Sequence, residues 1–326
     1  MPPFALKVTR LGLSGLSRIS PQLAGKAAFK LFCLTPSRRP QGAKAKMAHA
    51  EGRARLSSAE AIMLSFRGGQ AMAYRFNGGA KGRRPRYLVV HGWGSRSEYM
   101  SELAAFLVDT GAEVVSLDLP GHGRSPGHFL NLRFAVSAIA AAAERFGAFD
   151  ATIGHSFGGA SVALAAAGFL PGIEPVLPER LVLIGAPSAM GWLFTHFGRL
   201  MALGPETQAA FEAEVGRITG RLLKDYDVTR DVRDLGRPML VVHAEDDKEV
   251  SADHARAYAK AGGDVRVFWA NGFGHRRIVS AAPVLEAIGE FLAEAQTSIE
   301  DKEAFETDDE TVISLFRAPA RAARSV

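Results

Sequence analysis

Three polar residues could carry out acyl chemistry if the fold brings them together. Ser156 lies in the stretch GHSFGG, between Gly154 and Gly158, where a short β-branched run changes into an alanine-rich run. This pattern predicts a strand that turns sharply into a helix, with the serine held at the turn. Such a backbone costs roughly 1–3 kcal/mol, which glycine neighbours make tolerable. A serine raised in this way can act as a nucleophile.

A serine nucleophile needs a base within hydrogen-bond reach and an acid that orients the base. His275 follows the last expected strand in the stretch WANGFGHRR, and the stretch VVHAEDDKEV offers Asp246 and Asp247 after the preceding strand. Loops that follow parallel strands leave the same edge of the sheet, so these groups can meet Ser156. Spacing alone does not decide between the two aspartates.

A reacting carbonyl also needs N–H donors for the negative charge that develops on its oxygen. In the stretch YLVVHGWGS, Gly92 and Gly94 allow the chain to turn close to the serine. The backbone N–H groups of Trp93 and Phe157, the latter directly after the serine, are the expected donors. No glycine-rich phosphate motif and no metal-ligand spacing is present, so we expect no cofactor and no metal.

The elements that position these residues alternate between short strands and helices. We expect eight short strands, at residues 62–66, 71–76, 87–91, 113–118, 151–154, 181–184, 239–243 and 265–269. Helical patterns cover residues 97–109, 131–145, 157–170, 252–261 and 283–293. A tight Gly68–Gly69 turn followed by alternating strands and helices predicts a mostly parallel sheet with helices on both faces and an antiparallel edge.

Residues from about 187 to 236 are an insertion in this alternation of strands and helices. We expect them to form a small helical cap over the carboxyl ends of the strands. Trp192, Phe194 and Phe197 in this insertion are the expected substrate-binding residues. Each of them could equally pack in the core. Their spacing does not place all three on one helix face, so we expect at least one to point inward.

The composition divides the chain into three parts. Residues 1–60 hold eleven Lys or Arg and two Glu, a net charge of +9, so the rest of the chain carries −4 of the total of +5. We therefore expect a basic N-terminal extension over residues 1–59, a catalytic domain over 60–296 and a flexible tail over 297–326. The acidic body argues against nucleic-acid binding.

The extension holds two expected helices, at residues 6–19 and 22–34, and residues 36–55 have the composition of a solvated linker. In the second helix Leu23, Ala27 and Leu31 form an apolar face beside Lys26 and Lys30. This face could pack on the body or lie on an anionic membrane surface. Since the extension offers no catalytic group, we expect ester hydrolysis to survive deletion of residues 1–45.

The motifs HGWGS, DLPGHGRS, GHSFGG, HAEDDKEV and GFGH occur in an order and spacing that resemble those of the α/β-hydrolase superfamily, over roughly residues 60–296. The resemblance implies an α/β-hydrolase fold, with Ser156 as nucleophile, His275 as base and Asp247, rather than Asp246, as acid. It also implies that the loop containing His122 is structural. Ala244 stands where relatives often have glycine.

These residues predict a serine esterase or thioesterase that acts on a small-molecule ester or thioester with an apolar acyl group. An acyltransferase with the same triad and a non-catalytic ligand-binding relative are the alternatives. The single cysteine, Cys33, excludes an internal disulfide and fits a reducing compartment. We therefore expect a cytoplasmic protein, with peripheral membrane contact as an alternative, and the sequence does not define its oligomeric state.

Overall fold

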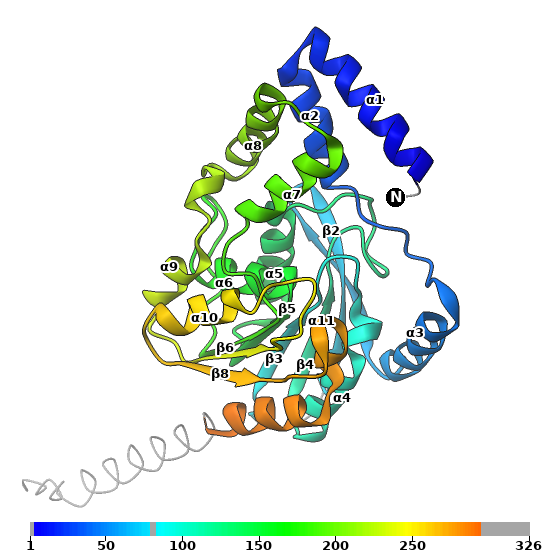
Figure 1. The fold of residues 1–326 in the computed structure, drawn as a ribbon. Helices are drawn as coiled ribbons and strands as arrows, with labels where there is room; N and C mark the ends of the chain where they lie inside the picture. The colour runs from blue at the N-terminus through cyan, green and yellow to red at the C-terminus, as the bar shows by residue number, and fades with distance from the viewer. Residues whose placement is uncertain (1–2, 79–82, 295–326) are drawn as a thin grey trace, which may run out of the picture.

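The central element is an eight-stranded sheet with the order β1-β2-β4-β3-β5-β6-β7-β8 (Figure 1). A computed structural model describes residues 3–78 and 83–294 of the chain. The strands are β1 (Glu60–Phe66), β2 (Gly69–Phe76), β3 (Arg86–Val90), β4 (Glu113–Asp118), β5 (Ala151–His155), β6 (Arg180–Ile184), β7 (Met239–His243) and β8 (Val265–Trp269). β2 pairs antiparallel with β1 and β4, and the other pairs are parallel. The predicted mostly parallel sheet with an antiparallel edge is confirmed.

Strand β5 lies in the middle of the parallel part of this sheet. It pairs with β3 on one side, where Gly154 lies opposite Val90, and with β6 on the other, where Gly154 lies opposite Leu183. All five residues of β5 are buried. The turn that follows β5 therefore opens at the centre of the carboxyl edge, where open α/β sheets bind their ligands.

Helices cover both faces of the sheet, and the side chains of each strand alternate between two cores. In β3, Leu88 and Val90 belong to one core, whereas Tyr87 and Val89 belong to the other. The first core is covered by α5 (Leu132–Phe146), α6 (Phe157–Ala166), α9 (Val228–Arg233) and α10 (Asp253–Lys260). The second is covered by α4 (Ser101–Asp109), which follows η1 (Ser97–Met100), and by the helix over residues 282–294. Two short helices, α11 (Gly274–Arg277) and η3 (Ile278–Ser280), precede the last one.

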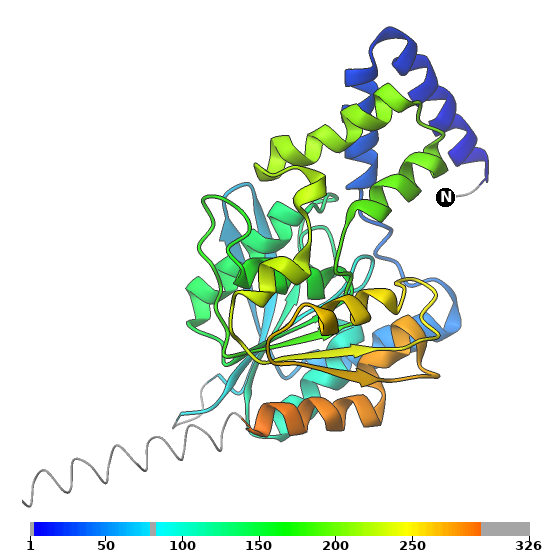
Figure 2. The same cartoon turned by 60° about the vertical axis from the view of Figure 1, so that its left-hand side comes forward.

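The insertion after β6 forms two cap helices, α7 (Gly191–Met201) and α8 (Pro205–Thr219), followed by η2 (Leu223–Asp225) and by α9. Two N-terminal helices, α1 (Pro3–Ile19) and α2 (Pro21–Phe32), stand against α7 and α8 above the sheet (Figure 2). Gly25 of α2 allows this contact, because a Cβ there would lie 2.6 Å from the Cβ of Ala210 on α8. The cap is therefore built from two segments that are far apart in the sequence.

The expected linker over residues 36–55 is wrong, because most of it is helix α3 (Gly42–Leu56). Its alanine, lysine, glutamate and arginine residues favour a helix intrinsically, although they form no apolar stripe. The helix lies beside α4 (Figure 1) and approaches the body at Gly52, where a Cβ would lie 2.0 Å from the carbonyl oxygen of Glu98. A charged composition was thus compatible with a docked helix.

Residues 297–326, expected to form a flexible tail, lie outside the described residues. Within the described ranges, none of the helices combines the length and the apolar character that crossing a membrane would require.

Candidate active site

Ser156 occupies the turn between β5 and α6 with an unusual backbone. Its φ of 52° and ψ of −122° lie outside the regions that L-residues favour, and its N–H donates a 2.8 Å hydrogen bond to the carbonyl of Ile184. The turn is tight, since a Cβ on Gly154 would lie 2.5 Å from the carbonyl oxygen of Gly158. Glycine at both positions therefore allows the strand and the helix to meet around the serine.

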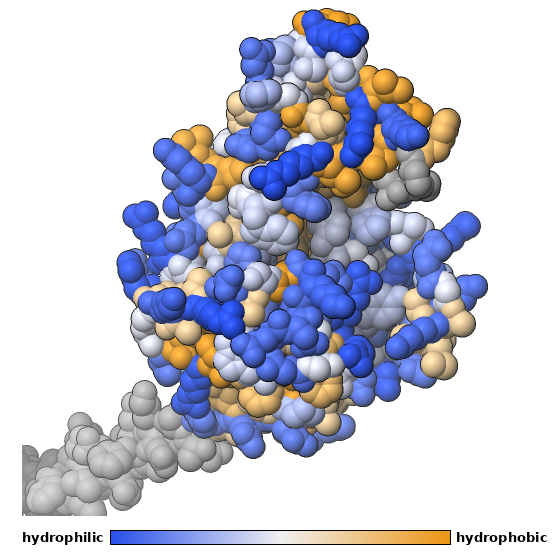
Figure 3. Space-filling view, viewed as in Figure 1, coloured by the Kyte–Doolittle hydropathy of each residue, from blue (hydrophilic) through white to orange (hydrophobic). Residues whose placement is uncertain are grey.

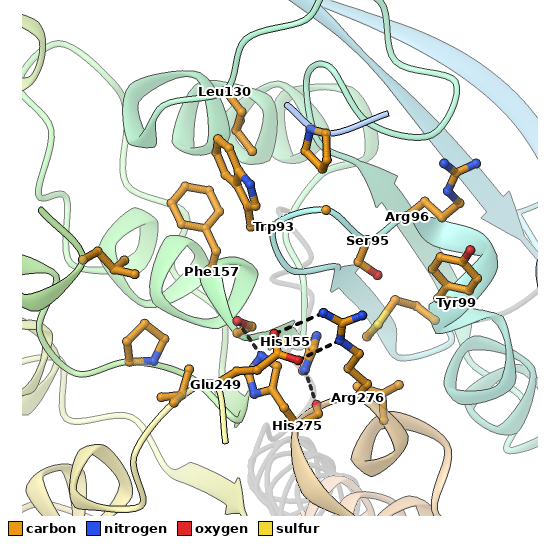
Figure 4. A pocket seen from close by; sticks show the side chains of 18 of the residues that line it. Trp93, Ser95, Arg96, Tyr99, Leu130, His155, Phe157, Glu249, His275 and Arg276 are labelled. Atoms are coloured by element: carbon orange, nitrogen blue, oxygen red, sulfur yellow. Dashed lines mark hydrogen bonds and ion pairs between the residues drawn. The ribbon is translucent and has the colours of Figure 1, made fainter. Parts of the chain in front are cut away.

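The loop after β3 lies directly against this turn. A Cβ on Gly92 would lie 2.9 Å from the Cβ of Ser156, so only glycine allows the loop to come this close. The next residue is Trp93, whose ring lies 5.9 Å from the ring of Phe157 in an edge-on contact (Figure 4). Phe157 is the first residue of α6, and the first N–H groups of a helix have no partner within it.

His122 holds the loop after β3 in place through a hydrogen bond to Gly94. The N–H of Gly94 donates a 2.9 Å hydrogen bond to Nε2 of His122. Burial lowers the pKa of His122 to about 3, so the ring stays neutral and Nε2 can accept. The family resemblance implies a structural role for the loop that contains His122. The contact with Gly94 is consistent with that role, because it holds the loop after β3 in place.

His275 connects Ser156 to Asp247. Its Nε2 lies 3.0 Å from Oγ of Ser156, and its Nδ1 lies 2.6 Å from Oδ2 of Asp247. Gly185 leaves room for this pair, because a Cβ there would lie 3.3 Å from Nδ1 of His275. The structure therefore brings together the serine, histidine and aspartate that were named from the sequence.

The two neighbouring aspartates have different contacts. Burial alone would raise the pKa of the Asp247 carboxyl, but hydrogen bonds from His275 and from the backbone N–H groups of Val250 and Glu249 hold this pKa below its usual value. Asp247 is therefore an anion that can orient a histidine. Asp246 instead accepts a 2.8 Å hydrogen bond from the N–H of Gly272.

His155 contacts both the ring and the backbone of His275. Sequence reasoning missed this contact. Alternation along the strand predicts that His155 points away from the serine. Its ring lies 4.8 Å from the ring of His275, and its Nε2–H donates a 2.9 Å hydrogen bond to the carbonyl of His275. Burial lowers the pKa of His155 to about 3, so this ring stays neutral. The sequence gives no signal for this contact, because it depends on the path of the loop after β8.

A cavity of about 1190 Å³ opens above Ser156 and His275, which both line it. The predicted substrate-binding residues Trp192, Phe194 and Phe197 line it too. They differ in burial: Phe194 is buried, Phe197 is half-buried and Trp192 is exposed. One of the three thus packs inward, and the others remain more accessible.

The N-terminal helices also line this cavity, although residues 1–45 were expected only to contribute no catalytic group. Phe29 and Phe32 of α2 contribute to its apolar side, and Lys44 and Arg55 of α3 contribute to its polar side. The Phe32 ring lies 4.7 Å from that of Phe194 and 5.2 Å from that of Phe197. A truncated chain would lose a wall of the cavity.

The opposite side of the cavity is polar. Ser95, Arg96, Tyr99 and Arg276 lie there (Figure 4), and Nε of Arg276 lies 2.7 Å from a carboxylate oxygen of Glu249. The cavity therefore has an apolar side beneath the cap and a polar side beneath α3, with Ser156 between them. Within residues 3–78 and 83–294, no group of three or more His, Cys, Asp or Glu side chains is arranged to hold a metal ion.

The fold and the site together define a class of α/β proteins. Its members have a mostly parallel sheet and a serine on the turn after the central strand, and this chain has both features. The model of the alpha/beta hydrolase family matches residues 87–287, which is more than half of the sequence. The chain belongs to the alpha/beta hydrolase family.

Part of the sequence is similar to that of a lipase. Over 156 residues the chain is 30% identical to a frog protein, the sn-1-specific diacylglycerol lipase ABHD11 of Xenopus laevis. The match covers 46% of this chain and 47% of that protein, so the chain spans about half the length of this curated relative.

Solved structures share the fold at low sequence identity. Est1E from Butyrivibrio proteoclasticus is 19% identical with a TM-score of 0.56, and the match covers 73% of this chain and 99% of that one. The esterase Pf2001 of Pyrococcus furiosus is 16% identical with a TM-score of 0.55, and the match covers 80% of this chain and 97% of that one. These similarities establish the fold.

Proposed function

We propose that this protein is a serine hydrolase that cleaves a carboxylic ester or thioester through an acyl-enzyme on Ser156. The observation that carries the proposal is the chain of two contacts, 3.0 Å from Ser156 to His275 and 2.6 Å from His275 to Asp247. A serine within reach of a histidine that is held by a carboxylate is the arrangement that activates a hydroxyl. Membership of a family with lipases and esterases supports the same chemistry.

The proposed reaction has two halves. His275 accepts the Ser156 proton at Nε2 as Oγ forms a bond to the acyl carbon, and His275 then gives this proton to the departing alcohol or thiol as the old C–O or C–S bond breaks. Water attacks the acyl-enzyme in the same way and releases the acid. Asp247 holds Nδ1 protonated throughout and stabilises the positive charge on the ring.

The oxyanion that forms in each half needs donors on the side away from His275. We assign this role to the backbone N–H groups of Trp93 and Phe157. The close approach of Gly92 to Ser156 and the position of Phe157 at the start of α6 support the assignment. Such donors stabilise the tetrahedral intermediate by roughly 3–4 kcal/mol each.

The two sides of the cavity suggest a substrate with two chemically different ends. Apolar side chains beneath the cap, including Trp192, Phe194 and Phe197, would bind an acyl chain. The polar side, with Arg96 and Arg276, would accept a polar leaving group. The name of the frog relative, a diacylglycerol lipase, supports a lipid-like ester.

The direct test measures hydrolysis of p-nitrophenyl esters and thioesters of increasing chain length, with product analysis in the presence of a competing alcohol. Release of free acid supports the proposal. Transfer of the acyl group to the alcohol in preference to water would show an acyltransferase with the same residues. Absence of turnover together with saturable ester binding would show a ligand-binding relative instead.

We expect Phe32→Ala to change the preference for acyl chain length. The Phe32 ring contacts the rings of Phe194 and Phe197 at the apolar side of the cavity. Its loss should lower kcat/KM for long-chain esters relative to short ones by about 5–150-fold, equivalent to ~1–3 kcal/mol of discrimination. The control is Phe66→Ala, since Phe66 is also partly buried but packs on Phe134, outside the lining of the cavity. Equal profiles for both variants would exclude Phe32 from the acyl site.

A further inference from the structure

Helix α1 is attached to the cap by one of its faces. Leu13 is buried, Nε of Arg10 donates a 2.8 Å hydrogen bond to the carbonyl of Leu200 at the end of α7, and Oγ of Ser17 lies 2.7 Å from Oγ1 of Thr207 on α8. These contacts come from two cap helices, so they fix the rotation of α1 about its axis. They also determine which residues of α1 point away from the protein.

The opposite face of α1 is apolar and exposed. Phe4, Val8, Leu11 and Ile19 are 79%, 52%, 73% and 80% exposed. Their spacing places them along one stripe of the helix. Figure 3 shows hydrophobic residues gathered at the end of the molecule formed by the cap and the N-terminal helices. A contiguous exposed apolar surface of this kind marks a binding site for a protein or a membrane.

Positive charge surrounds this stripe. Lys7 and Arg18 are exposed and lie next to it on α1, and the described residues 3–32 hold five Lys or Arg and no Asp or Glu. Apolar side chains with flanking cations are the composition of helices that lie in the headgroup region of anionic membranes. A second copy of the chain would bring the same cations together, which disfavours self-association through this face.

We propose that α1 lays its exposed stripe on the surface of an anionic lipid bilayer and holds the protein there peripherally. The expectation from the sequence placed such a contact on the second helix. In the structure, the face of α2 that holds Ala24, Ala28 and Phe29 is buried within the cap, whereas on the expected face Leu23 is exposed and Ala27 and Leu31 are half-buried. Helix α1 supplies the larger free apolar face, with four exposed large apolar side chains.

The position of α2 would bring the cavity near the bilayer. Phe29 and Phe32 line the cavity at the end of α2, and this helix of 12 residues is about 18 Å long. A bound α1 would therefore carry with it the helix that forms part of the cavity wall. The consequence for substrate access rests on the proposed ester hydrolysis, whereas the binding itself does not.

The test is co-sedimentation of the full chain with phosphatidylcholine vesicles, with and without phosphatidylglycerol. We expect binding to the anionic vesicles that weakens with added salt. Leu11→Ser should lower the partition coefficient about tenfold, and Arg18→Glu should lower it about fivefold or more. The matched controls, Leu177→Ser and Arg145→Glu, lie before β6 and β5, at the edge of the sheet away from the cap, and should bind like the parent.

Several outcomes would overturn the proposal. These are equal sedimentation with and without anionic vesicles, or an equal loss of binding in Leu11→Ser and Leu177→Ser. A parent chain that dimerises in sedimentation velocity and becomes monomeric in Leu11→Ser would show that this face binds a second copy. Since vesicle binding requires no catalysis, a chain that binds lipid without hydrolysing esters would refute only the proposed function.

Discussion

Ser156→Ala is expected to lower kcat/KM for ester hydrolysis by ~10⁴–10⁶-fold. The members of such a triad act as one unit, so removal of the nucleophile leaves only the contribution of binding and of the oxyanion donors. The fold should survive, because the substitution removes one hydroxyl and the N–H of residue 156 can still donate to the carbonyl of Ile184. Initial rates at substrate concentrations far below KM measure the effect.

The matched control for this variant is Ser95→Ala. Ser95 lines the same cavity on its polar side (Figure 4). It differs from Ser156 because the hydrogen bond of His275 is made to Ser156. We expect the control to retain kcat/KM within about tenfold. A Ser156→Ala enzyme that keeps a rate close to that of the parent would exclude Ser156 as the nucleophile.

Asp247→Asn should lower kcat by ~10⁴-fold, because an amide cannot hold His275 in the tautomer that leaves Nε2 free to accept the serine proton. Asn retains an oxygen that can accept the N–H groups of Glu249 and Val250, so the loop should keep its shape. The effect is therefore expected in kcat, with little change in the melting temperature.

The neighbouring aspartate provides the control for this prediction. Asp246 accepts the N–H of Gly272, and an asparagine oxygen can replace that acceptor. We expect Asp246→Asn to keep kcat within about tenfold of the parent. If Asp246→Asn were instead the more damaging substitution, the acid would be Asp246 and the proposed pairing with His275 would be wrong.

The fold was predictable because its signals are local and repeat along the chain. Short β-branched strands alternate with alanine-rich and leucine-rich helices, and all eight strands lie within two residues of their expected positions. The parallel order then places the ends of β5, β7 and β8 at one edge of the sheet. This is why Ser156, Asp247 and His275 could be named together before their distances were known.

The walls of the site were harder to predict, because they depend on contacts between distant segments. Helix α2 meets α7 and α8 about 170 residues further along the chain, and nothing in its own periodicity identifies this partner. The three-residue spacing of Phe29 and Phe32 indicates an apolar helix face but not which surface it covers. Helix α3 has no apolar stripe at all, so its composition resembled that of a linker.

One contact of His275 was also beyond the reach of sequence reasoning. The contact of His155 with His275 joins residues 120 apart and is set by the loop after β8. The choice between Asp246 and Asp247 likewise depends on how one loop turns. Side-chain direction in loops follows tertiary contacts, whereas in strands and regular helices it follows the period of the element.

The central claim is that Ser156 is an activated nucleophile, and covalent labelling tests it most directly. The full chain is treated with a fluorophosphonate, whose phosphorus forms a bond to an activated serine oxygen as fluoride leaves, and peptide mass spectrometry locates the adduct. We expect one adduct per chain, on Ser156, with loss of esterase activity in parallel and no labelling of Ser156→Ala. A chain that hydrolyses esters but carries its adduct on another residue, or carries none, would contradict the account.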